Sequence, residues 1–142
     1  MSPISRRFLA TAAAFLGCGL ALGLWMLVGR ELRGVWPSPW LVSAHTHLLL
    51  VGTILSTILG TALWLFPRPP RGAPPLQPWL GEAAYWCLTL GTTARAIGEV
   101  AHASSNAAGW RLLTVAGGAF QLIGMGFGVG ALRARVRGPA LG

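Results

Sequence analysis

Residues 40–66 read WLVSAHTHLLLVGTILSTILGTALWLF, an apolar run without a carboxylate, a lysine or an arginine. A helix needs about 20 apolar residues to cross the hydrocarbon core of a bilayer, and this run is longer than that. Irregular backbone does not face lipid, because no water is present there to satisfy its hydrogen-bonding groups. The run therefore predicts one membrane-spanning α-helix.

Three further apolar runs flank this one, at residues 8–28, 80–103 and 110–132. Each is long enough to span a bilayer, and turn-forming residues separate it from the next. The tryptophans gather near the ends of the runs, as in the aromatic belts of membrane proteins. We therefore expect an all-α fold, a four-helix transmembrane bundle made by one membrane domain, 1–142, with 40–66 as its second helix.

The composition also indicates a membrane protein. Charged residues make up 10% of the chain, whereas soluble domains carry about 25%. The net charge is +8, and all 11 basic residues are arginines. These arginines stand in small groups between the apolar runs and form no basic stripe with interleaved aromatic residues. The sequence thus predicts contact with the lipid bilayer and argues against a nucleic-acid partner.

The arginines further predict how the chain is oriented. Cytoplasmic loops of membrane proteins carry an excess of basic residues. With the N-terminus inside, the larger group of flanking arginines is cytoplasmic, so we expect both termini in the cytoplasm and a multi-pass protein of the plasma (inner) membrane. The cytoplasmic group is Arg6, Arg7, Arg68, Arg71, Arg133, Arg135 and Arg137, and the opposite group is Arg30, Arg33 and Arg111.

The first helix has an alternative interpretation as a cleaved signal. Ser5-Arg6-Arg7-Phe8-Leu9 resembles a twin-arginine signal, and Leu16-Gly17-Cys18 resembles part of a lipoprotein cleavage site. The twin-arginine pattern has a residue between the arginines and Phe-Leu that is missing here. The apolar run also continues well past Cys18. We therefore favour a retained first helix, with cleavage as the alternative.

Few ionisable residues fall inside the apolar runs, and each needs a partner or a function there. His45 and His47 lie near the start of the second run, and a polar group lies toward the end of the third. Because neighbouring runs are antiparallel, both groups are expected on the same side of the membrane. Arg95 and Glu99 are one helical turn apart and predict a structural polar pair. The residues that share that face of the third helix are Thr92, Arg95, Glu99 and His102.

Helical phase separates the two histidines of the second run. His47 lies about 200° around the helix from His45. His45 shares its face with small residues, which allow the close approach of another helix or of a flat cofactor, and phase therefore favours His45 as the inward residue. The small residues of this face are Gly52, Ser56 and Gly60, and the fourth helix has a similar face with Gly117, Gln121, Gly124 and Gly128.

Histidines from two neighbouring helices, at similar depth in an apolar bundle, suit axial ligation of a haem. The second run offers His45 or His47, and the third offers His102. A copper or zinc site made by these three histidines is the alternative. It is less favoured, because the i, i+2 spacing places His45 and His47 on opposite faces of one helix.

The stretch Ala44–Gly52, AHTHLLLVG, carries a resemblance that extends through Gly60 to Leu65-Phe66-Pro67-Arg68. It resembles the second helix of subunit I of cytochrome c oxidase and the other haem-copper oxidases, and of nitric oxide reductases. Short membrane proteins related to that subunit are more similar still. The resemblance implies a helix that runs inward from outside, in agreement with the arginines, and a histidine near its outer end that ligates haem b. It aligns His47 with this ligand, whereas helical phase favours His45.

The resemblance covers the second helix well and the others only in pattern. With 3 histidines in the whole chain, the protein alone lacks the ligands of the family's oxygen-reducing centre, so we do not expect an oxidase. It implies a small haem-b-binding protein with a role in respiratory electron transfer or gas sensing. The alternative is a non-catalytic accessory or assembly subunit of a respiratory oxidase or nitric oxide reductase complex. The expected protein partners are further copies of the chain or subunits of such a complex.

Overall fold

The computed structural model describes residues 1–66 and 77–136. Within these residues every regular element is helical, and no strand is present. Because α2, η1 and α3 follow one another without a break, the described elements form four helical rods, which confirms the predicted all-α four-helix fold. The elements are α1 (Pro3–Arg33), α2 (Pro39–His47), η1 (Leu48–Leu55), α3 (Ser56–Leu65), α4 (Pro78–His102) and α5 (Ala108–Val136).

α1 and α5 extend beyond the predicted bounds at both ends, whereas the second rod and α4 begin slightly earlier than predicted and end one residue earlier. Ser2 caps α1 by accepting a hydrogen bond from the backbone N–H of Ser5 at 3.3 Å. Ser38 caps α2 through the N–H of Leu41 at 3.4 Å. α1 ends at Gly34, whose φ of 65° is the left-handed conformation that suits glycine at a helix C-terminus.

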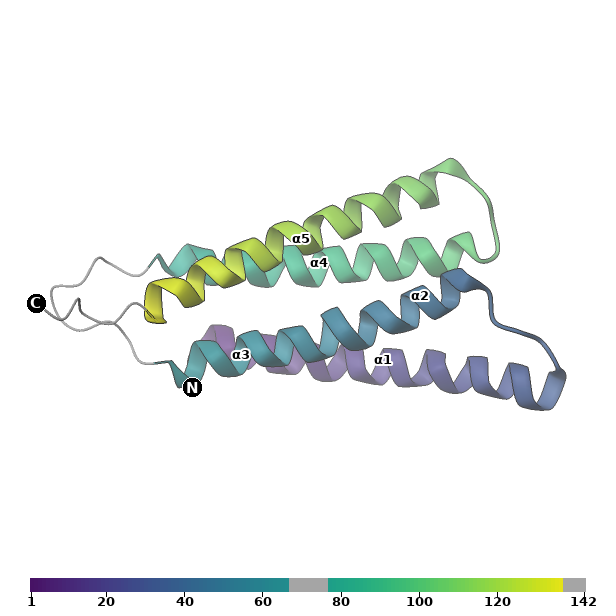
Figure 1. Cartoon of the computed structure of the whole chain (residues 1–142), viewed down its shortest axis with the longest axis horizontal. Helices are drawn as coiled ribbons and strands as arrows, with labels where there is room; N and C mark the ends of the chain where they lie inside the picture. The colour runs from purple at the N-terminus through teal and green to yellow at the C-terminus, as the bar shows by residue number, and fades with distance from the viewer. Residues whose placement is uncertain (67–76, 137–142) are drawn as a thin grey trace, which may run out of the picture.

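The rods form two helical hairpins (Figure 1). One hairpin is α1 with the continuous α2–η1–α3 rod, and the other is α4 with α5. α4 packs closely along α5, and the two hairpins meet chiefly through α2 and α4. The start of α1 and the end of α5 lie at one end of the bundle, here called the terminal end, and the α1–α2 and α4–α5 turns lie at the other, the turn end.

Three of the rods are apolar and long enough to cross a membrane, namely Pro3–Arg33, Pro39–Leu65 and Ala108–Arg133 among the described residues. This supports a membrane protein. α4 has 25 residues and is also long enough, at about 1.5 Å per residue, but it carries more charge. Several of its polar side chains turn inward: Thr92 is fully buried and Glu99 is 1% exposed. The orientation count relies partly on Arg68, Arg71 and Arg137, which lie outside the described residues.

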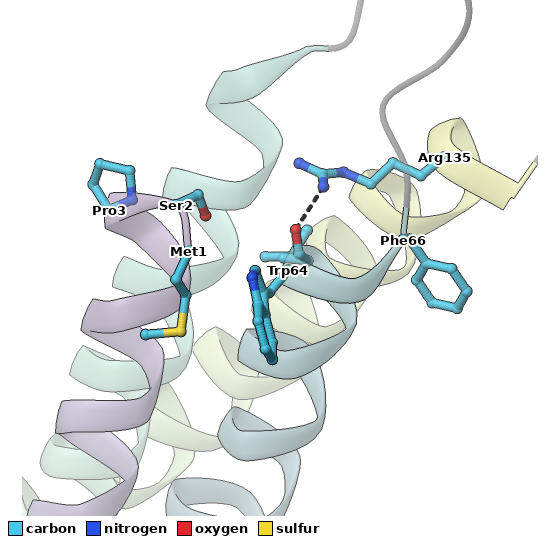
Figure 2. Close-up of a pocket in the computed structure, with 7 residues that line it drawn as sticks. Met1, Ser2, Pro3, Trp64, Phe66 and Arg135 are labelled. Carbon is cyan, nitrogen blue, oxygen red and sulfur yellow. Dashed lines mark hydrogen bonds between the residues drawn. The ribbon is translucent and has the colours of Figure 1, made fainter.

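Apolar packing and ionic contacts close the terminal end of the bundle. The core there is formed by Phe8, Leu59, Leu63, Ala84, Leu88 and Ala131. Arg7 pairs with Glu82 at 3.0 Å and so joins α1 to α4. Arg135 of α5 donates a hydrogen bond to the backbone carbonyl of Leu63 at 2.6 Å (Figure 2). Because the carbonyls in the last turn of a helix lack partners within it, this arginine also caps α3.

Candidate functional site

The second rod changes its helical form directly after His47. Residues Leu48–Leu55 form a π-helix, which the sequence did not predict. Two hydroxyl groups bond to carbonyl oxygens five residues earlier: Thr53 to Leu48 at 3.0 Å and Ser56 to Val51 at 3.3 Å. π-Helical segments are rare and occur frequently at functional sites, so this stretch makes the region around His47 a candidate site.

His45 faces the first helix. Its Nδ1 atom lies 2.9 Å from the carbonyl oxygen of Gly19. Its ring rests on Gly23, where an added Cβ would lie 2.6 Å from the ring carbon Cε1. Phase therefore predicted correctly that His45 turns toward a neighbouring helix, but the ring is wedged against α1.

The small face that follows His45 is filled by the same helix. A Cβ added at Gly52 would lie 2.8 Å from the ring of Phe15, and one at Gly60 would lie 2.8 Å from Phe8. Ser56, between them, is buried. Of the two uses expected for this face, helix packing and cofactor contact, the structure shows helix packing.

His102 lies at the end of α4 and takes part in a local cap. Its Nδ1 atom is 3.1 Å from the carbonyl oxygen of Ser105, just beyond the helix. Its ring packs edge-to-face on Trp40, with ring centroids 4.3 Å apart. The side chain is buried, and His102 does not line the groove beside His47 that is described next.

His47 is held by its own helix and faces open space. Its Nδ1 atom lies 2.8 Å from the carbonyl oxygen of Ser43, one turn earlier. Because a carbonyl oxygen only accepts hydrogen bonds, Nδ1 carries the ring proton, and Nε2 keeps its lone pair. Among the described residues no hydrogen bond engages Nε2. Nε2 is therefore the ring nitrogen of His47 that remains available to a ligand.

A groove of about 500 Å³ runs beside His47. One wall comes from α2 and η1, the floor from α4, and the other wall from α5. The groove opens because α5 and the second rod approach each other at the terminal end and diverge toward the turn end (Figure 1). Its lining is mainly apolar, and α2, α4 and α5 each contribute one polar side chain. The lining residues are His47, Val51, Arg95, Val115, Gly118, Ala119, Gln121, Leu122 and Met125.

A buried polar network lies under this groove. Glu99 Oε1 accepts hydrogen bonds from the hydroxyl of Ser43 at 2.7 Å and from Nε of Arg95 at 3.0 Å. Arg95 Nη1 also donates to Gln121 at 3.4 Å, and Gln121 donates to Thr92 at 3.1 Å. The structure thus shows the Arg95–Glu99 pair that the spacing suggested, and it extends that pair to three helices. Glu99 Oε2 is buried without a hydrogen-bond partner among the described residues.

The three histidines do not converge. His45 contacts α1, His102 contacts Trp40, and His47 faces the groove. Over residues 1–66 and 77–136, no three His, Cys, Asp or Glu side chains are placed to hold a metal ion together. The structure therefore does not assemble the alternative copper or zinc site from these residues, nor does it bring two imidazoles together for one haem.

Sequence reasoning missed Ser43, which links the site together. Its hydroxyl reaches Glu99 on another helix, while its carbonyl fixes the tautomer of His47. The available signal was its place one helical turn before His47, where a backbone carbonyl meets the side chain four residues later. Its approach to Glu99 depends on how α2 packs on α4, and the sequence alone does not give that packing.

No protein-family model, no curated protein and no solved structure matches this chain.

Proposed function

We propose that this protein binds haem b in the groove, with Nε2 of His47 as an axial ligand, and that it serves in respiratory electron transfer or gas sensing. The resemblance of AHTHLLLVG supports this proposal, since it aligns His47 with the haem ligand. When bound, haem would supply an iron that exchanges electrons or binds a diatomic gas. All other contributions come from the side chains of the chain.

The state of the His47 ring is the observation that carries the proposal. Histidines that ligate metals commonly donate their other ring N–H to a carbonyl or carboxylate, which fixes the tautomer and the ring orientation. His47 has this arrangement, since its Nδ1 lies 2.8 Å from the Ser43 carbonyl oxygen and the residue lines the groove. His45 and His102 also use Nδ1 on carbonyl oxygens, but their rings are packed against Gly23 and Trp40.

The groove itself fits a flat apolar cofactor. Its volume of about 500 Å³ lies within the range of about 300–1,000 Å³ that is usual for cofactor sites. The small residues Gly118 and Ala119 leave space along the α5 wall, and Val51 of η1 and Leu122 of α5 make the two walls apolar. Because Glu99 already pairs with Arg95, the floor adds no uncompensated charge beneath an apolar ligand.

The test is the visible spectrum of the detergent-purified protein after haem supplementation. We expect a Soret band in the wild type and in the His45→Gln and His102→Gln variants, because glutamine still offers a donor to the carbonyl groups of Gly19 and Ser105. We expect the band to be lost in His47→Gln. A Soret band that survives unchanged in His47→Gln would refute this ligand assignment, and no band in any form of the protein would refute haem binding.

The second candidate function is that of a non-catalytic accessory or assembly subunit of a respiratory oxidase or nitric oxide reductase complex. The lateral opening of the groove favours it, since Gly118 and Ala119 would allow the helix of another subunit to approach closely. Purification in mild detergent would then recover respiratory subunits together with this chain. Recovery of the chain by itself, or with further copies only, would count against this function.

We also propose that all four rods span the plasma (inner) membrane, with the terminal end of the bundle in the cytoplasm. The arginines at the two ends support this orientation. The buried position of the polar side chains of α4 supports its inclusion, because the faces that remain toward lipid are largely apolar.

A further inference from the structure

The groove offers only one imidazole, whereas a six-coordinate haem needs two axial ligands. Among the residues that line it, His47 is the one imidazole. His45 is pressed between α2 and α1, and His102 is turned toward Trp40. A second imidazole for iron at His47 would have to come from outside this chain, and the groove is open on the side where it would enter.

We propose that two copies of this chain share one haem, each copy giving Nε2 of His47 as an axial ligand. This inference rests on the proposed function and adds to it the partner and the stoichiometry of the site. The groove of one copy faces the same groove of the other, so the occupant of the open side is a second copy of the chain.

Two-fold symmetry places the two His47 side chains at the same depth in the membrane, as a shared haem requires. Copies inserted in the same direction are related by a two-fold axis along the membrane normal, and this axis places the same residue of both copies at the same depth. The two His47 side chains then approach the axis from opposite sides. No residue beyond those already lining the groove is required.

The charge on the groove permits it to face a copy of itself. Two identical surfaces bring like charges together, and an unpaired arginine there would oppose association. Arg95 is paired with Glu99 at 3.0 Å, so the arginine brings no uncompensated charge to the meeting surface. Apart from His47 and Gln121 the rest of that surface is apolar, and Val115 and Leu122 are 69% and 71% exposed in the single chain.

Met125 is the rival second ligand within one chain, because thioethers also ligate haem iron. It lies seven residues after Gly118, which is about 10 Å further along α5 at 1.5 Å per residue. Gly118 lies beside the guanidinium of Arg95. His47 lies at a similar depth in the bundle, because Ser43 bonds both to His47 and to Glu99, the partner of Arg95. Met125 is therefore offset from His47 along the bundle, whereas the second copy of His47 is not.

The first experiment measures the haem-to-chain ratio of the full-length protein purified in detergent and saturated with haem. The proposal predicts one haem for every two chains, a dimer by native mass spectrometry, and the low-spin ferric electron paramagnetic resonance signal of two imidazole ligands. Met125→Leu should leave all three unchanged. One haem per chain, a high-spin signal, or a signal altered by Met125→Leu would overturn the shared site and leave the proposed function standing. Absence of haem would overturn both.

The second experiment tests the facing grooves by disulfide trapping in a background with Cys18→Ala and Cys87→Ala. Leu122→Cys, in the groove wall, should form a disulfide-linked dimer under mild oxidation in membranes. Leu24→Cys is the matched control, since Leu24 is 62% exposed on α1 and lies outside the groove. Equal trapping at both positions, or trapping at Leu24 alone, would overturn the proposed interface.

Discussion

At the scale of single residues, Ser43 connects the free histidine to the buried carboxylate. Its carbonyl holds Nδ1 of His47 at 2.8 Å, and its hydroxyl donates to Glu99 at 2.7 Å across the contact between α2 and α4. A carboxylate that is 1% exposed needs such donors, because no water replaces them inside a bundle. The same serine thus positions the ligand and stabilises the floor beneath it.

Ser43→Ala should therefore lower the free energy of unfolding by about 1–2 kcal/mol, the loss expected for one interhelical bond to a charged group. Circular dichroism during denaturation by sodium dodecyl sulfate measures this value. Thr46→Ala is the matched control, since the Thr46 hydroxyl bonds only to the Val42 carbonyl of its own helix. Equal losses in the two variants would show that the contact with Glu99 adds nothing.

Arg95 is the countercharge of Glu99, so its removal should cost more. Arg95→Leu leaves a buried carboxylate without a positive partner, and we expect a loss of about 3 kcal/mol in the same assay. Glu99→Gln added to Arg95→Leu should recover most of it, because the amide is neutral and still accepts from Ser43. A double variant no more stable than Arg95→Leu would contradict this account of the pair.

At the scale of elements, the α4–α5 hairpin depends on close backbone contact. A Cβ added at Gly117 would lie 2.6 Å from the backbone nitrogen of Arg95 and 2.7 Å from the Gly91 carbonyl oxygen, and neither atom can move without shifting its helix. Small residues of this kind let membrane helices pack tightly. The separation of α4 and α5 in turn sets where Arg95 meets Gln121 under the groove.

Gly117→Ala should therefore lower the thermal unfolding temperature in detergent and weaken haem retention, since it pushes α5 away from the floor of the groove. Gly126→Ala is the control on the same helix, because an added Cβ there meets nothing within 4 Å. We expect the control to unfold at the same temperature as the wild type or slightly higher, given the better helix propensity of alanine. A Gly117→Ala protein that behaves like its control would show that the helices are less closely packed than described.

The sequence predicted the elements better than it predicted the site. Apolar runs of sufficient length account for the four rods, because lipid permits few other structures. Phase also placed His45 toward a neighbouring helix, but it could not say that the neighbour is α1 and that α4 and α5 lie on the His47 side. Which helices the His45 face and the His47 face of the second rod contact depends on how the two hairpins pack together. The π-helix at Leu48–Leu55 was missed because its backbone hydrogen bonds produce no hydrophobic period that the sequence could reveal.

At the scale of the whole molecule, the number of membrane crossings depends on whether α4 spans the bilayer. It carries Glu82, Arg95 and Glu99, and it falls outside the set of helices that are membrane-spanning by hydropathy alone. Its charges have protein partners: Glu82 pairs with Arg7, and Arg95 with Glu99. Since the insertion cost of a charge falls when protein rather than lipid surrounds it, α4 can cross the membrane as part of the bundle.

Cysteine labelling at the two ends of α4 tests this directly, again with Cys18→Ala and Cys87→Ala. Gln77 precedes α4 and Ser105 follows it, and both residues are exposed. If α4 spans and the terminal end is cytoplasmic, a membrane-impermeant maleimide added to intact cells should label Ser105→Cys and should not label Gln77→Cys until the membrane is opened. Val35→Cys, in the exposed turn between α1 and α2, should label together with Ser105→Cys, because the two turns share one end of the bundle.

Labelling of Gln77→Cys alone would reverse the orientation, and equal labelling of Gln77→Cys and Ser105→Cys would mean that α4 does not cross. If α4 does not cross, Glu99 on α4 could not lie at the depth of Ser43 and His47 on α2, and α4 could not form the floor of the groove.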